Sequence, residues 1–90
     1  PQIRIKTEAE EYVYPLDSTE IIAVSGPLGI STIELANGRV RVVSDPGPRQ
    51  ICVNQGWIYE PGDWLACLPS KILITVEGKR RQASIDILVY

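Results

Sequence analysis

DPGPRQICVNQGWIYEPGDWLACLP, residues 45–69, interrupts a chain that otherwise consists of short alternating segments. It contains both cysteines, both tryptophans, three of the seven glycines and four of the seven prolines. Proline lacks an N–H donor and restricts φ, so Pro46 and Pro48 exclude a continuous strand through its first part. Residues 50–55 leave room for at most one helical turn, which Gly56 ends. We therefore expect an irregular, cysteine-containing loop.

Apolar side chains recur at every second position in most of the remaining sequence, which predicts β-strands. No long segment has the periodicity of a helix, and 90 residues suffice for one domain and are too few for two. We therefore expect one domain over residues 1–90 with an all-β fold. The expected architecture is a small antiparallel sandwich or barrel of seven or eight short strands with one irregular loop. These seven or eight strands are expected among nine segments with strand character, residues 3–6, 12–14, 19–24, 30–35, 39–43, 57–60, 64–68, 72–77 and 85–89.

Two dipeptides predict specific turns. Asn37 and Gly38 both accept positive φ, so they favour a type I′ hairpin between the strands on either side. Pro61 and Gly62 match the two central positions of a type II turn. Residues 19–24 carry apolar side chains on both faces, which predicts a strand in the centre of a sheet.

The charge balance argues against electrostatic binding of nucleic acid. Nine Lys and Arg stand against eleven Asp and Glu, whereas nucleic-acid binding needs a concentrated basic surface. The basic run at residues 79–81 is expected to be a solvated turn, and Arg39 and Arg41 are expected to lie on a solvated sheet face. The chain has no histidine, which excludes sites that need imidazole as a base or metal ligand.

Two strings carry a family resemblance. Residues 26–45, GPLGISTIELANGRVRVVSD, combine a Gly-rich turn, a strand and an Asn-Gly hairpin. Residues 51–69, ICVNQGWIYEPGDWLACLP, combine a cysteine-containing loop, a GWI motif, a turn and a CLP ending. In this order the features resemble the NusG domain II family over residues 16–76, and the motifs at 56–58 and 67–69 make the resemblance specific.

The resemblance implies a compact β-rich fold without an established catalytic activity. The family occurs as an insert in some bacterial transcription factors and as free-standing proteins behind an N-terminal membrane anchor. This chain has no room for the other domains of the factor, so it resembles the free-standing kind. Pro1 cannot be a translation start, which fits an anchor removed upstream. We expect an extracytoplasmic domain anchored to the cell membrane, with a cytoplasmic location as the alternative.

The cysteines depart from the family pattern. The family loop often reads Cys-Pro-x-x-x-Cys, and Gly47 stands here at the first cysteine position, ahead of Pro48. A disulfide between Cys52 and Cys67 would close a loop of about 14 residues and stabilise the fold by roughly 3 kcal/mol in the chain-entropy model. If the missing cysteine usually pairs with one of them, the two instead remain as buried free thiols. A redox-active pair is a third interpretation, although this spacing lacks the CxxC geometry that lowers a thiol pKa.

Trp57, Tyr59 and Trp64 flank the predicted turn at residues 61–62, so their rings could lie side by side. Exposed, they would form an interaction patch for a protein, a glycan or a single-stranded base. Buried, they would be the largest members of the core in a chain without Phe or Met. We favour the buried interpretation, since each ring hides about 150–250 Å² in typical cores.

No residue pattern supports catalysis or metal binding. The serines have no histidine to activate them, and two cysteines without histidine do not make a zinc site. Residues 26–29 do not follow the strand, Gly-rich loop and helix order of a phosphate loop. We therefore predict that the chain is not an enzyme and that it has no catalytic residue, cofactor or metal.

The expected function is a non-catalytic interaction module that docks an unidentified protein partner through its loop-rich face. One alternative is a domain that contacts nucleic acid, by analogy with the transcription-factor insert, and the acidic pI of about 5.0 weighs against it. The other is a redox or accessory protein that uses Cys52 and Cys67. Contact with a membrane is expected only through a segment absent from this chain.

Overall fold

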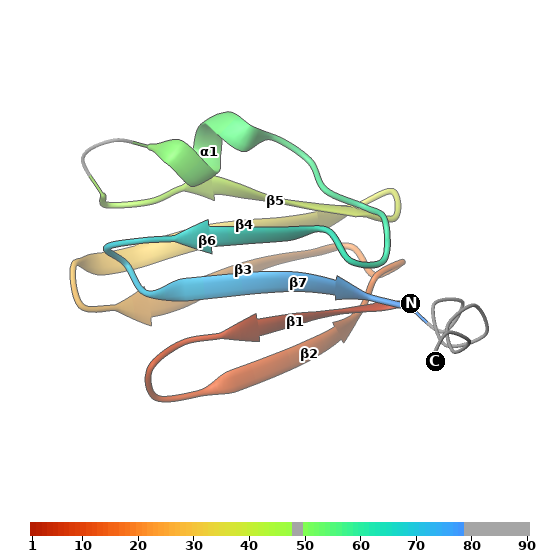
Figure 1. Cartoon of the computed structure of the whole chain (residues 1–90), viewed down its shortest axis with the longest axis horizontal. Helices are drawn as coiled ribbons and strands as arrows, with labels where there is room; N and C mark the ends of the chain where they lie inside the picture. The colour runs from red at the N-terminus through yellow and green to blue at the C-terminus, as the bar shows by residue number, and fades with distance from the viewer. Residues whose placement is uncertain (48–49, 79–90) are drawn as a thin grey trace, which may run out of the picture.

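The computed structural model describes residues 1–47 and 50–78, which contain seven strands and one short helix. The strands form two antiparallel sheets that pack face to face (Figure 1). The four-stranded sheet has the order β2 (Glu11–Pro15), β1 (Gln2–Lys6), β7 (Ile72–Glu77) and β6 (Trp64–Cys67). The three-stranded sheet has the order β3 (Glu20–Gly26), β4 (Gly29–Ala36) and β5 (Arg39–Ser44), and α1 (Ile51–Gln55) connects β5 to β6.

The all-β sandwich predicted from the sequence is confirmed. The single helical turn expected in residues 50–55 is present as α1. The predicted strand at residues 85–89 and the basic run at residues 79–81 lie outside the described residues.

Aliphatic side chains from both sheets form the core. Period-two alternation places Ile3 and Ile5 of β1 on the inner face, and Ile33 and Leu35 of β4 occupy the corresponding face of the other sheet. The residues between them point outward, which explains the alternating burial along these strands. The sheets are offset, so that β2 extends beyond β3 on one side, while α1 lies beyond β6 on the other (Figure 1).

The segment predicted as a central strand is instead an edge strand. β3 pairs only with β4 in the described residues, although residues 19–24 are apolar on both faces. Ile22 and Val24 point into the core, whereas Ile21 is 66% exposed. The prediction assumed that a strand with apolar side chains on both faces is covered on both faces. Nothing in the described chain covers the outer face of β3, so the apolar side chains on that face are exposed.

The segment 57–60 does not form the predicted strand. Its only ladder contact among the described residues is a bridge in which Val40 N donates to Ile58 O at 3.0 Å and Ile58 N donates to Val40 O at 2.9 Å. The N–H groups of Tyr59 and Glu60 donate instead to Asp63 Oδ2, at 3.2 and 3.0 Å. This one side-chain acceptor replaces strand partners immediately after Ile58 and ends the pairing.

Both predicted turns have the expected geometry. Asn37 has φ of 55° and Gly38 has φ of 73°, as a type I′ hairpin requires. Gly62 has φ of 98°, and Asp63 N donates to Glu60 O at 2.9 Å across the type II turn.

The cysteine pair attaches α1 to the end of β6. Cys52 in α1 and Cys67 in β6 lie at disulfide-bonding distance, with their Cα atoms 5.6 Å apart. Their side chains are 3% and 1% exposed. The structure therefore favours the disulfide over two separate thiols, although Gly47 stands at the first cysteine position of the family.

A half-buried carboxylate holds the irregular loop against the sandwich. Asp45 Oδ1 accepts hydrogen bonds from Ser31 Oγ and Ser70 Oγ, each at 2.8 Å, and Asp45 Oδ2 accepts one from Gly47 N at 2.9 Å. Gln50 Nε2 donates to the carbonyl oxygens of Asp45 and Gly47, each at 2.6 Å. Burial acts to raise the pKa of Asp45, but the hydrogen bonds from Ser70, Ser31 and Gly47 outweigh it, and the pKa is lowered.

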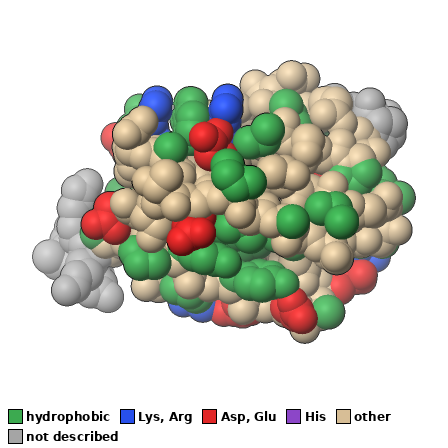
Figure 2. Space-filling model, turned by 180° about the vertical axis from the view of Figure 1, so that it is seen from behind, with side chains coloured by type: hydrophobic (Ala, Val, Ile, Leu, Met, Phe, Trp, Pro, Cys, Tyr) green, Lys and Arg blue, Asp and Glu red, His purple; other side chains and the backbone are tan. Residues whose placement is uncertain are grey.

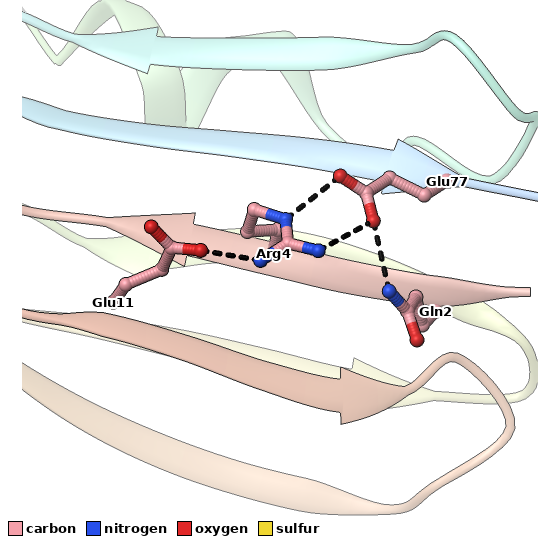
Figure 3. A network of polar contacts seen from close by, with 4 residues as sticks. All are labelled: Gln2, Arg4, Glu11 and Glu77. Carbon is pink, nitrogen blue, oxygen red and sulfur yellow. Dashed lines mark hydrogen bonds and ion pairs between the residues drawn. The ribbon is translucent and has the colours of Figure 1, made fainter.

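An ion-pair network crosses the outer surface of the four-stranded sheet. Arg4 Nε and Nη2 donate to the two oxygens of Glu77 at 2.8 and 3.1 Å, and Arg4 Nη1 donates to Glu11 (Figure 3). Gln2 Nε2 also donates to Glu77, at 2.8 Å. The hydrogen bonds from Arg4 and Gln2 lower the pKa of Glu77 to about 2. The network thus joins β1 to both of its neighbours in the sheet.

The substitution Asp45→Asn should lower the free energy of unfolding by about 1–3 kcal/mol. Asparagine has one acceptor oxygen where aspartate has two, so the Gly47 N–H and the two serine hydroxyls can no longer all donate to this side chain. Urea unfolding followed by tryptophan fluorescence measures the change. The control is Asp17→Asn, which alters an exposed carboxylate outside the cluster and should leave the midpoint unchanged. Equal midpoints for Asp45→Asn and the original protein would contradict a stabilising role for the cluster.

The Glu77 carboxylate should stabilise the fold in a defined pH range. Its pKa is about 2 in the folded chain, against an ordinary value of 4.5, so the stabilisation is complete above pH 4.5 and is lost as the pH falls toward 2. We expect Glu77→Gln to cost about 1 kcal/mol or less at neutral pH, because the pair is partly solvated. Urea midpoints measured at neutral pH and near pH 2 test this. The difference between Glu77→Gln and the original protein should shrink in acid, and a constant difference would refute the assignment.

Candidate protein-interaction surface

The predicted burial of the aromatic side chains is wrong. Trp64 is 61% exposed, Tyr59 is 52% exposed, and Trp57 is half-buried. Ile58 and Leu65 occupy the inward positions next to them. Because side chains alternate along an extended chain, the burial of these two aliphatic residues turns the neighbouring rings outward.

The three rings are divided between two surfaces of the sandwich. Trp57 and Tyr59 flank Ile58, whose backbone pairs with β5, so they lie on the side of the three-stranded sheet. Trp64 alternates with the buried Leu65 in β6 and therefore lies on the outer surface of the four-stranded sheet. Leu73, which is exposed in the neighbouring β7, shares that outer surface. The tryptophans accordingly do not meet in one patch.

On the three-stranded sheet, Trp57 is held by two arginines. The guanidinium carbon of Arg39 lies 4.5 Å from the centroid of the indole, and that of Arg41 lies 4.6 Å from it. Arg41 Nε and Nη2 also donate to Glu34 Oε1 at 2.9 and 2.8 Å. We call these four residues, Glu34, Arg39, Arg41 and Trp57, the tryptophan–arginine cluster. Figure 2 views this side of the molecule, where two basic side chains stand at the upper left with a hydrophobic side chain between them.

The local sequence explains how the cluster forms. The hairpin at residues 37–38 starts β5, and period-two alternation puts Arg39 and Arg41 on the same outward face. The bridge between Val40 and Ile58 then places Trp57 beside both arginines. From the sequence we predicted a solvated face for the arginines and not their contact with the ring. The bridge that brings them together joins Val40 and Ile58, and no local pattern connects residues 18 positions apart.

The cluster is suited to recognition. Cation–π contacts of this kind contribute about 0.5–1 kcal/mol each at exposed sites, so they hold the ring and the guanidinium groups in position. Tryptophan and arginine are also the residues most often found at the energetic centres of protein interfaces. Within residues 1–47 and 50–78, no group of three or more His, Cys, Asp or Glu side chains is arranged to hold a metal ion.

The cysteines are poorly placed for exchange with an external thiol. Reactive cysteines usually lie in partly exposed, electropositive surroundings, whereas Cys52 and Cys67 are buried in the core cluster. The described part of the chain also has no helix long and apolar enough to cross a membrane.

The chain is similar to one protein family and to several individual proteins. The model of the NusG domain II family matches residues 1–80. An uncharacterized protein of Treponema pallidum (strain Nichols) is 36% identical over 74 residues, which cover 82% of this chain. The match spans 51% of that curated relative, so this chain corresponds to about half of its length.

Solved structures share the fold over most of the chain. A DUF1312 family protein from Enterococcus faecalis V583 is 28% identical with a TM-score of 0.77, and the match covers 87% of this chain and 97% of that one. A DUF1312 family protein from Ruminococcus gnavus is 25% identical with a TM-score of 0.76, covering 86% and 97% of the two chains. Together with the family match over nearly the whole length, these similarities agree with the sandwich described above. The chain belongs to the NusG domain II family.

Proposed function

We propose that this domain is a non-catalytic module that binds a protein partner through the tryptophan–arginine cluster. The observation that carries the proposal is the half-buried indole of Trp57 in contact with both Arg39 and Arg41 on an outward sheet face. A ring and two guanidinium groups in fixed positions lose little side-chain entropy on binding. A partner that covers the ring would also remove the arginine contacts from water and strengthen them.

The charges of the cluster favour a protein over nucleic acid. Glu34 pairs with Arg41 and compensates its charge, which leaves one net positive charge in the cluster. The whole chain has a net charge of −2, so the counterion release that drives nucleic-acid binding is weak here. Burial of both cysteines likewise disfavours a redox role.

We further propose that the domain works outside the cytoplasm, attached to the cell membrane through a segment absent from this chain. The cysteine pair at bonding distance supports this location, because disulfides persist in oxidising compartments. Protein taken from its native cells, denatured without reductant and treated with a maleimide should show no labelling of Cys52 or Cys67. Labelling of both would place the domain in a reducing compartment.

Site-specific crosslinking tests the proposed binding surface. A photoreactive benzoylphenylalanine in place of Tyr59 stands next to Trp57, and the same residue in place of Leu73 provides a control on the opposite surface. In the native cell, the protein carrying the probe at Tyr59 should give one discrete protein adduct, and the protein carrying it at Leu73 should not.

The adduct should depend on the cluster. Adding Trp57→Ala or Arg39→Ala should reduce its yield by about tenfold, which corresponds to about 1.4 kcal/mol and is typical of an interface centre. Equal adducts at both probe positions, or an adduct that nuclease removes, would overturn the proposal.

A further inference from the structure

The described residues leave one long sheet edge of the sandwich uncovered. β3 spans seven residues, Glu20–Gly26, and pairs with β4 on one side. No described residue makes a backbone hydrogen bond to its other side. The strand contains neither proline nor a basic residue, and its one charged residue is Glu20 at the start. Such an edge presents unpaired N–H and C=O groups to a partner strand.

The ladder pattern identifies the groups that face outward. The backbone N–H and C=O of Val40 both bond Ile58, so they point away from β4 and make no bond to its cross-strand partner Leu35. The backbone groups of Leu35 therefore point toward β3, and by alternation those of Ile33 do so as well. Their partners across β3 are Glu20 and Ile22. The remaining backbone groups, which face the open edge, are those of Ile21, Ala23 and Ser25.

The other three edge strands are shorter than β3, and β5 and β6 are also covered by or attached to neighbouring elements. β5 is covered by the bridge to Ile58 and by α1, which follows it in the fold. β6 is four residues long and is attached to α1 through Cys67. β2 ends at Pro15, which has no N–H to donate. β3 is therefore the longest edge that an added strand can reach.

Space and apolar surface adjoin this edge. The four-stranded sheet extends beyond β3, so that β2 has no strand of the three-stranded sheet opposite it (Figure 1). Tyr12 and Tyr14 of β2 pair with Ile5 and Ile3 and therefore point to the inner side of the sandwich, yet they are half-buried. A strand added to the open side of β3 would face these two rings and would extend the three-stranded sheet opposite β2.

The surroundings of the edge are acidic. Residues 7–38 contain six Asp and Glu and no Lys or Arg. Three of these six, Glu8, Glu11 and Glu34, form ion pairs with basic residues from elsewhere in the chain. The others are Glu10, Asp17 and Glu20, next to β2 or at the start of β3. In Figure 2, acidic side chains stand among the hydrophobic ones along the lower half of the molecule.

We propose that β3 accepts an extended segment of another protein as a fourth strand. The segment pairs antiparallel through the backbone groups of Ile21, Ala23 and Ser25. Its inward side chains are apolar and pack against Tyr12 and Tyr14, and its other positions carry Lys or Arg that meet the acidic surroundings. Backbone pairing supplies the affinity, and the alternate side chains supply the specificity.

A second copy of this chain is disfavoured as the occupant. Antiparallel pairing of two β3 strands places both four-stranded sheets on the same side of the joined sheet. In each copy β2 extends beyond β3, so it would occupy the space that β2 of the second copy requires. Ile21 lies opposite Glu34 of the tryptophan–arginine cluster, but the backbone groups that would pair with the segment belong to β3 and not to the cluster, so Trp57→Ala distinguishes the two proposals.

A synthetic peptide tests the proposal directly. The probe is about eight residues long, the length of a typical strand, and alternates valine with lysine. The control peptide alternates valine with glutamate. Titration into the isotope-labelled domain, followed by NMR, should show saturable binding of the first peptide, with slowed hydrogen exchange at the amides of Ile21, Ala23 and Ser25. The second peptide should bind at least tenfold more weakly.

Matched variants locate the contact. Ala23→Pro removes one outward N–H and should reduce affinity by about tenfold or more. Ile21→Lys places a positive charge beside the edge and should also weaken binding, whereas Leu73→Lys, on the opposite surface, and Trp57→Ala should not. Far-ultraviolet circular dichroism checks folding, and if Ala23→Pro unfolds, Ile21→Lys and the exchange data carry the test.

Three results would overturn the proposal. They are the absence of binding by the valine–lysine peptide, equal binding of both peptides, and exchange protection that maps to β5 or β6 and not to β3. Equal weakening by Ile21→Lys and Leu73→Lys would assign the effect to net charge and would refute the edge as the site.

Discussion

Packing of aliphatic side chains between two sheets is the interaction on which the rest of the structure depends. In a strand, a residue that points inward forces its neighbours outward. Burial of Ile58 and Leu65 therefore turns the adjacent Trp57 and Trp64 to the surface, even though they are the largest side chains in the protein. The aliphatic residues that are buried in the core therefore determine which neighbouring side chains the domain exposes.

Polar contacts then fit the irregular loop to this core. The loop after β5 has no ladder partners for its backbone groups, so the amide of Gln50 donates to the carbonyl oxygens of Asp45 and Gly47, and the carboxylate of Asp45 accepts the N–H of Gly47. The cysteine pair joins α1 to β6 at the same side of the sandwich. The described part of this stretch, residues 45–47 and 50–69, is thereby held in a defined shape, and the bridge at Ile58 brings Trp57 to the arginines of β5.

Prediction from the sequence succeeded where the signal was local. The Asn37-Gly38 hairpin, the turn at residues 61–62 and the alternation of most strands each depend on a few adjacent residues. It failed where a distant segment decides the outcome. Nothing within residues 19–24 says whether a second layer covers their outer face, and nothing near Trp57 indicates that arginines approach it. The serines that bond Asp45 are likewise 14 and 25 residues away from it.

Two levels of organisation can therefore be separated in this protein. Backbone preference and side-chain period, both properties of neighbouring residues, were sufficient for the all-β class, the turns and the absence of a long helix from the described residues. Strand order, sheet offset, the exposed edge of β3 and the position of the indole between two guanidinium groups arise from packing between segments far apart in the chain. Many pairings of short strands satisfy the same alternating pattern, and the burial of one common core selects among them.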